Sequence, residues 1–483
     1  MVYNLILNMK LNYLKFGTTG LCWLFGTTLL MAQQLTDQSE IKLNDLSAFN
    51  AAGKTWTIAE KVIAEPKNEN EVKPLKGLGI LVNSTSTKMK GSDLFTNAVH
   101  GNMILELDYL MAKNSNSGIY LQGNYEVQLK DSWGVLNPSS SDNGGIYERV
   151  DNTRPEGYQG YAPRQNASKA PGLWQHLKIA FQAPQFDAAG NKTVNARILS
   201  VELNGVLVQE NVELFGPTGG AADKEKALGP LRLQGDHGSV AFKNIKISKL
   251  TDDLINASNK GGDTTDPIYI DAPTNTMIRS FVNYAPKKLA VHAISVGSPQ
   301  KTHYSYDLDN GVLLHAWHGE FIDATPMWDG RGNGTSRARG AITSFAKIAA
   351  PAVAQLTNAQ ATWPTDTTGT GFKTKGYVID NEDRPQFKYN VYGAGVTDII
   401  TVSNDGKSLN RSVSVDKPVS NLYLLLANAS SIEELSKGFY LMDGQSYYLE
   451  LDKGAPKPII RDANGGKELI IQLDKQLNYS ISF

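Results

Sequence analysis

The chain's clearest candidates for chemistry are three polar side chains that alternate with apolar ones. Glu126, Gln128 and Lys130 are separated by Val127 and Leu129. Successive side chains of a strand point to opposite faces, so we expect the carboxylate, the amide and the ammonium group to share one face. Such a row is poorly suited to burial in a core. The sequence therefore predicts a strand that lines a polar cleft.

A histidine far along the chain is the second candidate. His237 lies between Asp236 and Gly238, in a predicted turn just before a strand. An imidazole in such a turn can reach the mouth of a cleft and titrate near neutral pH. Gln234, three residues earlier, could contact the same ligand. Either residue could equally be an ordinary turn or strand position.

The densest polar and aromatic cluster lies between residues 315 and 332. His315, His318 and Glu320 are potential metal ligands, but their spacing matches no strong ligand pattern. The strand period places His318 and Glu320 on one face and His315 on the other. Structural packing around Trp317 and Trp328 is the favoured interpretation.

Short alternating segments separated by turns must position these candidates. They are residues 104–110, 119–122, 177–181, 199–203 and 240–247. Asn204-Gly205, between two of them, is a strong hairpin signal. Regular strands with little helical periodicity predict an antiparallel β-sandwich over residues 56–250.

The remaining chain divides by composition. Residues 251–267 are polar and contain glycine, which is typical of a linker. Residues 268–483 are again β-rich and predict a second, sandwich-like domain of unknown role. Two short helices are expected there, at 343–350 and 431–437. The fold class is therefore all-β throughout.

The first 32 residues predict export. A weakly basic start and an apolar run from Leu21 to Met31 indicate a signal peptide cleaved near Ala32. A single membrane anchor is the alternative, but the run is too short to span a bilayer comfortably. Residues 33–55 are expected to form a short lead-in segment. We expect a mature protein that is periplasmic or extracellular and not inserted in a membrane.

Composition excludes several partner classes. The 483 residues carry 47 basic and 48 acidic side chains, for a formal net charge of −1. This balance gives no electrostatic case for binding nucleic acid or an anionic membrane surface. The length favours two or three domains. The one cysteine, Cys22, lies in the predicted leader.

Several ordered segments resemble the 3-keto-disaccharide hydrolase domain family, a concanavalin-like jelly roll of secreted bacterial proteins. The resemblance covers about residues 56–248, and the order of the segments carries it. They are residues 93–96, 104–110, 116–122, 125–132, 144–147, 171–179, 201–206 and 229–247. The resemblance implies a carbohydrate substrate, a cleft on one sheet, and cleavage of glycosides oxidised at carbon 3.

Such a substrate defines the chemistry to look for. A ketone at carbon 3 acidifies the carbon-2 hydrogen, so a base can remove it, the glycosidic oxygen can leave, and water can add later. The route needs a base, an enolate stabiliser and a proton donor. His237 and Glu126 are the catalytic candidates, and they could also hold one divalent metal ion. The expected substrate-binding residues are Gln128, Lys130, Tyr120, Tyr147 and Gln234, although a surface charge for Lys130 and core packing for the tyrosines are alternatives.

Other functions remain open. Retaining glycosidases of this fold need two carboxyl groups roughly 5–5.5 Å apart. The row at Glu126 has one acid, which argues against that mechanism but does not decide between elimination and hydrolysis. A non-catalytic carbohydrate-binding protein, in which the row only holds sugar, is the main alternative. A structural wall or matrix protein is the third possibility.

Overall fold

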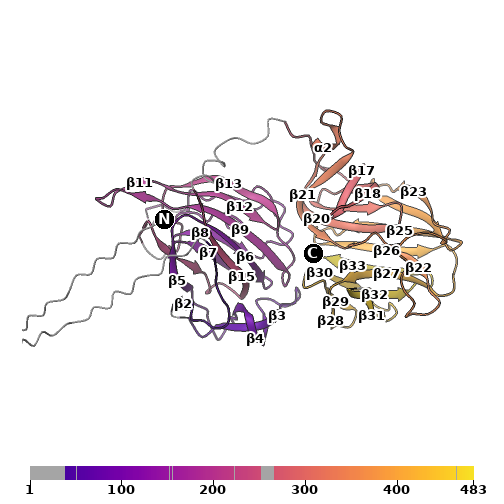
Figure 1. The fold of residues 1–483 in the computed structure, drawn as a ribbon, viewed down its shortest axis with the longest axis horizontal. Coiled ribbons are helices and arrows are strands. Elements are labelled where there is room, and N and C mark those ends of the chain that lie inside the picture. Colours follow the sequence, from indigo (N-terminus) through magenta and orange to yellow (C-terminus); the bar gives the residue numbers. More distant parts are fainter. Residues whose placement is uncertain are drawn as a thin grey trace, which may run out of the picture. The chain divides into compact units, whose positions relative to one another are not determined.

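The computed structural model describes residues 38–50, 52–151, 153–154, 156–221, 224–251, 266–463 and 465–483. The predicted signal peptide, 1–32, and most of the predicted linker, 251–267, lie outside the described residues. The described chain is almost entirely β-structure, which confirms the all-β prediction (Figure 1).

Strands β1–β15 build a sandwich of two main sheets. One sheet has the order β13-β12-β9-β6-β15-β4-β3, and β1 also pairs with β15. The other has the order β2-β5-β14-β7-β8. Strands of the first sheet are β1 (Gln38–Glu40), β3 (Trp56–Ile63), β4 (Lys73–Asn83), β6 (Met103–Met111), β9 (Trp174–Gln182), β12 (Ala196–Leu203), β13 (Val206–Leu214) and β15 (Val240–Lys249). Strands of the second are β2 (Phe49–Asn50), β5 (Leu94–His100), β7 (Asn116–Leu121), β8 (Tyr125–Lys130) and β14 (Gly229–Leu233), and a small hairpin joins β10 (Gln185–Phe186) to β11 (Lys192–Val194).

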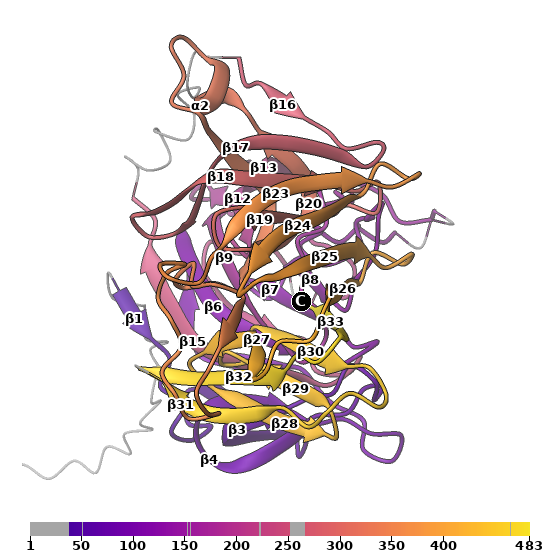
Figure 2. The same ribbon diagram turned by 90° about the vertical axis from the view of Figure 1, so that its right-hand side faces the viewer.

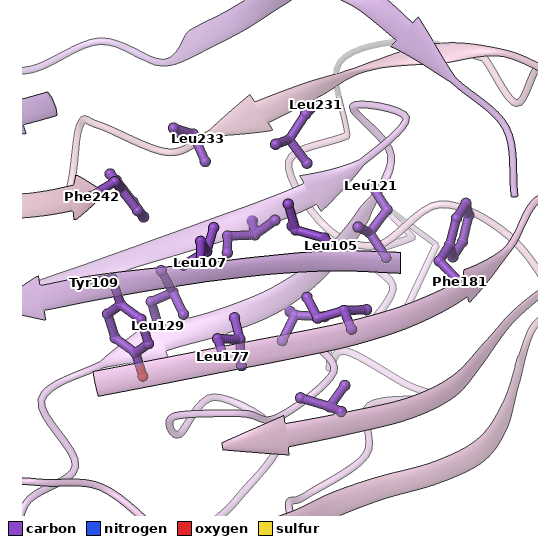
Figure 3. Close-up of a cluster of buried hydrophobic side chains, with 14 of the residues drawn as sticks. Leu105, Leu107, Tyr109, Leu121, Leu129, Leu177, Phe181, Leu231, Leu233 and Phe242 are labelled. Atoms are coloured by element: carbon purple, nitrogen blue, oxygen red, sulfur yellow. The ribbon is translucent and has the colours of Figure 1, made fainter. Parts of the chain in front are cut away.

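The two sheets share one apolar core. Figure 3 shows Leu105 and Leu107 of β6 close to Leu129 of β8 and to Leu231 and Leu233 of β14. Each of these side chains is almost wholly buried. Because strand side chains alternate, filling the inner face with leucines turns the intervening residues of β7, β8 and β14 to the outer face of their sheet.

Two local predictions can be compared with the sandwich. The hairpin at Asn204-Gly205 is confirmed, since Leu203 pairs with Val206 and both turn residues have positive φ. A two-residue turn of this kind matches the twist of the flanking strands. Residues 33–55, expected as a lead-in segment, contain β1 and β2, which pair with β15 and β5.

Strands β16–β33 form three further sheets (Figure 2). The first contains β16 (Tyr269–Ile270), β17 (Thr276–Ala285), β18 (Lys288–Gly297), β19 (Thr302–Asp307), β20 (Val312–Asp323) and β21 (Thr335–Ser344). The second has the order β22 (Val353–Gln355), β27 (Leu422–Ala429), β32 (Gly466–Gln472) and β31 (Ile459–Ala463). The third contains β23 (Lys373–Ile379), β24 (Pro385–Val391), β25 (Ala394–Val402), β26 (Ser408–Val415), β33 (Gln476–Ser482), β30 (Tyr447–Leu451), β29 (Phe439–Met442) and β28 (Ile432–Ser436). In the described residues, β1–β15 pair only with one another, and so do β16–β33.

The first of these sheets closes on itself. Strand β20 pairs with both β19 and β21, and β17 pairs with both β18 and β21. Strands β17–β21 therefore form a five-stranded barrel. The β17–β21 contact that closes the ring covers two residue pairs, so it removes the exposed strand edges only at that point.

Both predicted helices of this half are wrong. Residues 343–344 end β21, and residues 432–436 form β28, which pairs with β29. A helix this short is marginal by itself, so the long-range strand ladder decides the structure. The helix α2 (Thr325–Trp328) starts around Pro326. Among the described residues, no helix is long and apolar enough to cross a membrane.

A buried ion pair joins neighbouring strands of the third sheet. The Asp398 carboxylate accepts hydrogen bonds from the Arg411 guanidinium at 3.0 and 2.6 Å and from the Tyr306 hydroxyl at 2.9 Å. The Asp398 and Arg411 side chains are 0% and 5% exposed. Breaking a pair of this kind leaves an uncompensated buried charge.

We predict that Asp398→Asn lowers the free energy of unfolding by about 3–5 kcal/mol, because the Arg411 charge remains buried without its partner. Glu382→Gln is the control, since it removes the carboxylate that Arg384 contacts in an exposed pair. Its effect should stay below about 1 kcal/mol. Urea unfolding followed by tryptophan fluorescence measures both, and similar effects from the two variants would contradict the prediction.

Candidate functional site

The polar row of β8 lies on the outer face of the five-stranded sheet. Val127 and Leu129 are part of the sandwich core, so Glu126 and Gln128 point the other way, as predicted. Glu126 and Gln128 are only 1% and 3% exposed. The row is thus more deeply enclosed than the sequence indicated.

Strand pairing extends the row across the sheet. Tyr120 of β7 is directly opposite Glu126, Arg232 of β14 is opposite Tyr120, and Phe95 of β5 is opposite Arg232. Residues directly opposite in neighbouring strands share a face. The β7–β8 hairpin and the sequence-distant β14 therefore place an acid, a phenol and a guanidinium group side by side.

Arg232 is held from three sides. Its guanidinium contacts the Asp93 carboxylate at 2.5 Å and donates to the Gly220 carbonyl at 2.5 Å. It also lies over the Tyr120 ring, 4.1 Å from the centroid. A guanidinium fixed by an ion pair and an aromatic face is rigid. Arg232 therefore fixes the position of the Tyr120 ring beside Glu126.

Loop backbone covers the outer edge of β8. Gln128 donates its N–H to the Gly145 carbonyl at 2.8 Å and accepts from Gly144 N–H at 2.9 Å. The Tyr147 N–H donates to the Glu126 carbonyl at 3.1 Å. The Glu126 N–H donates to the Thr218 hydroxyl at 3.1 Å. These contacts pair the backbone edge of β8 at residues 126 and 128.

Gly118 makes room for the Glu126 carboxyl group. A Cβ atom at position 118 would lie 2.0 Å from Glu126 Oε1 and 2.8 Å from its carboxyl carbon. The carboxyl group therefore lies across the backbone of β7, and any side chain at position 118 would force it to move. The absence of a side chain at Gly118 is part of the site.

Four buried oxygen atoms on this face have no hydrogen-bond donor within the described protein. They are Asn116 Oδ1, Glu126 Oε1, Gln128 Oε1 and Gln234 Oε1. They come from β7, β8 and the end of β14. Buried acceptors are nearly always paired, and an unpaired one costs about 1–3 kcal/mol. This face is therefore chemically suited to a molecule that brings several donors.

Burial sets the protonation state of Glu126. It raises the pKa of this carboxyl group to about 8, and the nearby Tyr120 and Arg232 only partly oppose the increase. Burial also raises the pKa of the Tyr120 hydroxyl, and the Glu126 charge adds to that increase. Near neutral pH the carboxyl group therefore holds its proton and can act as an acid.

The other predicted binding residues divide into two groups. Gln234 follows β14, donates its N–H to the Gly118 carbonyl at 2.9 Å and is buried on the same face. Tyr147 is half-buried, and the Glu126 charge contributes to the raised pKa of its hydroxyl after burial and Glu148. Lys130, at the end of the row, is instead paired with Asp142 at 3.4 Å and has a 38% exposed side chain.

His237 lies at the margin of this face. Its carbonyl accepts from Asn116 N–H at 3.3 Å, which places the turn beside the start of β7. Its Nδ1 contacts Asp236 at 2.5 Å, and the side chain is 53% exposed. It forms no hydrogen bond or ion pair with Glu126 among the described residues. The structure therefore places the predicted histidine beside the start of β7 without joining it to the acid.

The predicted metal site requires His237 and Glu126 to converge. In the described chain, no three His, Cys, Asp or Glu side chains gather in a way that could hold an ion. The carboxyl group of Glu126 has an Arg232 guanidinium nearby, which disfavours a cation. The residues present do not fit a His and carboxylate metal site.

Sequence reasoning missed Arg232, Asp93 and Gly118 as parts of this face. Arg232 and Asp93 stand in segments that carry the family resemblance. Their meeting depends on the register of β5, β14 and β7, which a single sequence does not reveal. The one available signal was the Arg232 charge inside an otherwise apolar strand.

Comparisons with known proteins identify the first half of the chain. Residues 42–248 match the family model of the 3-keto-alpha-glucoside-1,2-lyase-like domain. This confirms the predicted family, with a start at residue 42 instead of 56. The match to this domain family, over residues 42–248, supports a carbohydrate-related function. No curated protein matches the chain.

Solved structures also resemble this chain. A proposed glycosyl hydrolase of Parabacteroides distasonis ATCC 8503 is 24% identical, with a TM-score of 0.33, and the match covers 44% of this chain and 84% of that one. A second from the same organism is 19% identical, with a TM-score of 0.28 and coverage of 44% and 100%. The carbohydrate-binding module CBM66 of Bacillus subtilis is 12% identical, with a TM-score of 0.21 and coverage of 40% and 94%. At these TM-scores the likenesses carry no argument.

We predict that Glu126→Gln makes stability less dependent on pH. Between the ordinary pKa of 4.5 and the folded value of about 8, the folded protein holds this proton more tightly than the unfolded chain does. The free energy of unfolding of the wild type must therefore fall as pH rises through this interval. The variant lacks that loss. The free energy of unfolding of Glu126→Gln, relative to that of the wild type, should therefore rise by a few kcal/mol between pH 5 and pH 9.

Urea unfolding at pH 5, 7 and 9 measures this effect. Glu202→Gln, in a half-exposed pair with Lys178 on the other sheet, is the control and should change stability by less than about 0.5 kcal/mol at every pH. A constant difference between wild type and Glu126→Gln across the three pH values would contradict the assignment.

We also predict that Gly118→Ala destabilises the protein by about 1–3 kcal/mol, because the new methyl group overlaps the Glu126 carboxyl group. The cost should shrink in a Glu126→Ala background, where that group is absent. A double-mutant cycle by urea unfolding measures the coupling. Additive effects, within about 0.5 kcal/mol, would show that the two positions do not interact.

Proposed function

We propose that residues 42–248 bind a carbohydrate on the outer face of β8, β7 and β14 and cleave glycosides oxidised at carbon 3. One observation carries the proposal: a buried, protonated carboxyl group lies among acceptor oxygens that lack protein donors. Sugar hydroxyl groups are donors that can satisfy such acceptors. The domain family supports the same class of ligand.

The proposed reaction is an elimination. A base removes the carbon-2 proton, the electron pair forms the double bond between carbons 1 and 2, and the bond from carbon 1 to the glycosidic oxygen breaks. Glu126 gives its proton to that leaving oxygen, since a pKa of about 8 keeps it protonated near neutral pH. Water then adds across the double bond.

The remaining residues receive supporting roles in this proposal. His237, oriented by Asp236, is the candidate base at the margin of the face. Gln128 and Gln234 accept hydrogen bonds from sugar hydroxyl groups. Tyr120 and Tyr147 contact the sugar, and Lys130 binds at the end of the row. Since the sequence predicts a leader, we place this activity outside the cytoplasm.

A non-catalytic carbohydrate-binding protein is the second candidate. It is favoured by one observation, the lack of contact between the exposed His237 and Glu126. In that case the acceptor oxygens would hold a sugar, and no group would be placed to remove a proton from carbon 2. Binding without turnover would be the result.

We predict turnover of a 3-keto-glucoside by the wild type, with release of the aglycone and a transient enone absorbance. Glu126→Gln should reduce kcat by about 10²–10⁴-fold, the contribution of a positioned acid or base. His237→Ala should reduce kcat to a similar extent. The wild type and both variants should be assayed with and without a chelator, which tests the divalent ion expected from the sequence.

Glu202→Gln is the matched control and should retain full activity. Circular dichroism and the melting temperature establish that each variant is folded. Saturable sugar binding without turnover of any 3-keto-glycoside would favour the non-catalytic alternative. Loss of activity on chelation, restored by added metal, would show that the activity requires a divalent ion and would contradict the conclusion drawn from the site residues.

A further inference from the structure

The barrel of β17–β21 has an unusually polar interior. Ser295 and Ser305 face one another across β18 and β19, with their hydroxyl groups 2.8 Å apart, and Ser280 and Ser336 do the same across β17 and β21 at 2.7 Å. All four serines are at least nine-tenths buried. A small barrel is normally filled by apolar side chains, so hydroxyl groups here call for a functional explanation.

A cavity of about 140 Å³ lies among these residues. Ser295, Ser305, His315 and Trp317 line it from β18, β19 and β20. Its other side is formed by β17 and β21, whose pairing in the described residues is limited to two residue pairs, at 281–282 and 335–336. The two strands separate beyond that point, and Asn283 and Arg337 stand there as exposed lining residues.

His315 is the polar side chain that points into this cavity without a partner. It is 4% exposed, and its ring has no hydrogen bond or ion pair among the described residues. Burial lowers its pKa to about 4, so it is neutral at physiological pH. The nearby His303 and His318 differ, because the ring nitrogens of both are engaged by protein atoms.

The charge of the lining favours an anion. Arg337 is the one charged residue of the cavity wall, and no carboxylate lines it. The ion pair between Arg337 and Asp323 is long, at 4.0 Å, and the Arg337 side chain is 71% exposed. Its guanidinium is therefore available for another anion. The other polar lining groups are Asn283, three serine hydroxyl groups and the imidazole of His315. The Ser295–Ser305 hydrogen bond uses one hydroxyl proton, so Asn283, the imidazole and the second hydroxyl group of that pair remain as donors.

The rest of the wall is apolar. Val282, Trp317, Ile322 and Ile342 line the cavity, and the Trp317 ring is held by hydrogen bonds from its N–H to two backbone carbonyls. A cavity of about 150 Å³ accepts a molecule the size of benzene. The ligand therefore needs an acidic head and a short apolar tail, with about four to seven non-hydrogen atoms.

We propose that the barrel of the C-terminal half is a binding site for a small monocarboxylate. The carboxylate lies towards Arg337 and accepts hydrogen bonds from the hydroxyl groups and the imidazole. The apolar tail contacts Trp317 and Ile322. This site is independent of the sheet that carries Glu126 and does not depend on the function proposed there.

Butyrate is the test ligand, measured by isothermal titration calorimetry against the full mature chain. We expect saturable binding with a dissociation constant in the millimolar range or tighter, as six non-hydrogen atoms allow. Butan-1-ol, which has the same tail without the charge, should bind at least 10-fold more weakly. The ring resonances of His315 in ¹⁵N-labelled protein should shift with butyrate.

Two variants test the assigned contacts. Arg337→Gln changes an exposed side chain, so folding should be preserved, and it should weaken butyrate binding at least 10-fold. His315→Gln should weaken it to a similar extent. His292→Gln is the control, since His292 lies on β18 but is exposed and contacts Asp309. It should bind butyrate like the wild type.

Three results would overturn the proposal. They are equal affinity for butyrate and butan-1-ol, unchanged butyrate affinity in Arg337→Gln, and no binding of butyrate at 100 mM, roughly two orders of magnitude above the expected range. Each can be obtained whether or not the chain cleaves a 3-keto-glycoside. Failure here and failure of the glycoside-cleaving function are therefore separate outcomes.

Discussion

The burial of one carboxyl group, that of Glu126, constrains the whole outer face of its sheet. The leucines of the inner face fix the orientation of β8, and Gly118 leaves the space in which the carboxyl group lies. Loop backbone from residues 144–147 pairs with the edge of β8, and Glu126 and Gln128 are almost wholly buried. Without this enclosure the group would have an ordinary acidity and could not retain a proton near neutral pH.

Local periodicity was enough to predict that Glu126 and Gln128 share one face of a strand. It was not enough to predict which residues of other strands join them there. A period of two assigns Glu126 and Gln128 to one side of a strand, and this holds because the alternate Val127 and Leu129 must be buried. Arg232 and Asp93 join that face through the register of strands more than a hundred residues apart. Register of this kind depends on the complete sheet and cannot be derived from one segment.

In the C-terminal half, too, strand period predicted which residues share a face but not how the strands assemble. The strand period correctly separated His315 from His318: one lines the barrel cavity and the other contacts Thr302 and the Phe483 carbonyl. The barrel itself was not predictable, because closure requires the parallel contact of β17 with β21. The two expected helices failed for a related reason, since residues 432–436 pair with β29 and residues 343–344 end β21.

The loop along β8 has a consequence for redesign. Its backbone is anchored to Glu126 and Gln128 by three main-chain hydrogen bonds, which depend on no side chain of residues 144–147. Side chains of this loop and its turns, such as that of Tyr147, can therefore be exchanged while the three main-chain hydrogen bonds to β8 remain. A library that varies these turns and keeps the backbone path would diversify ligand selectivity without disturbing the acid.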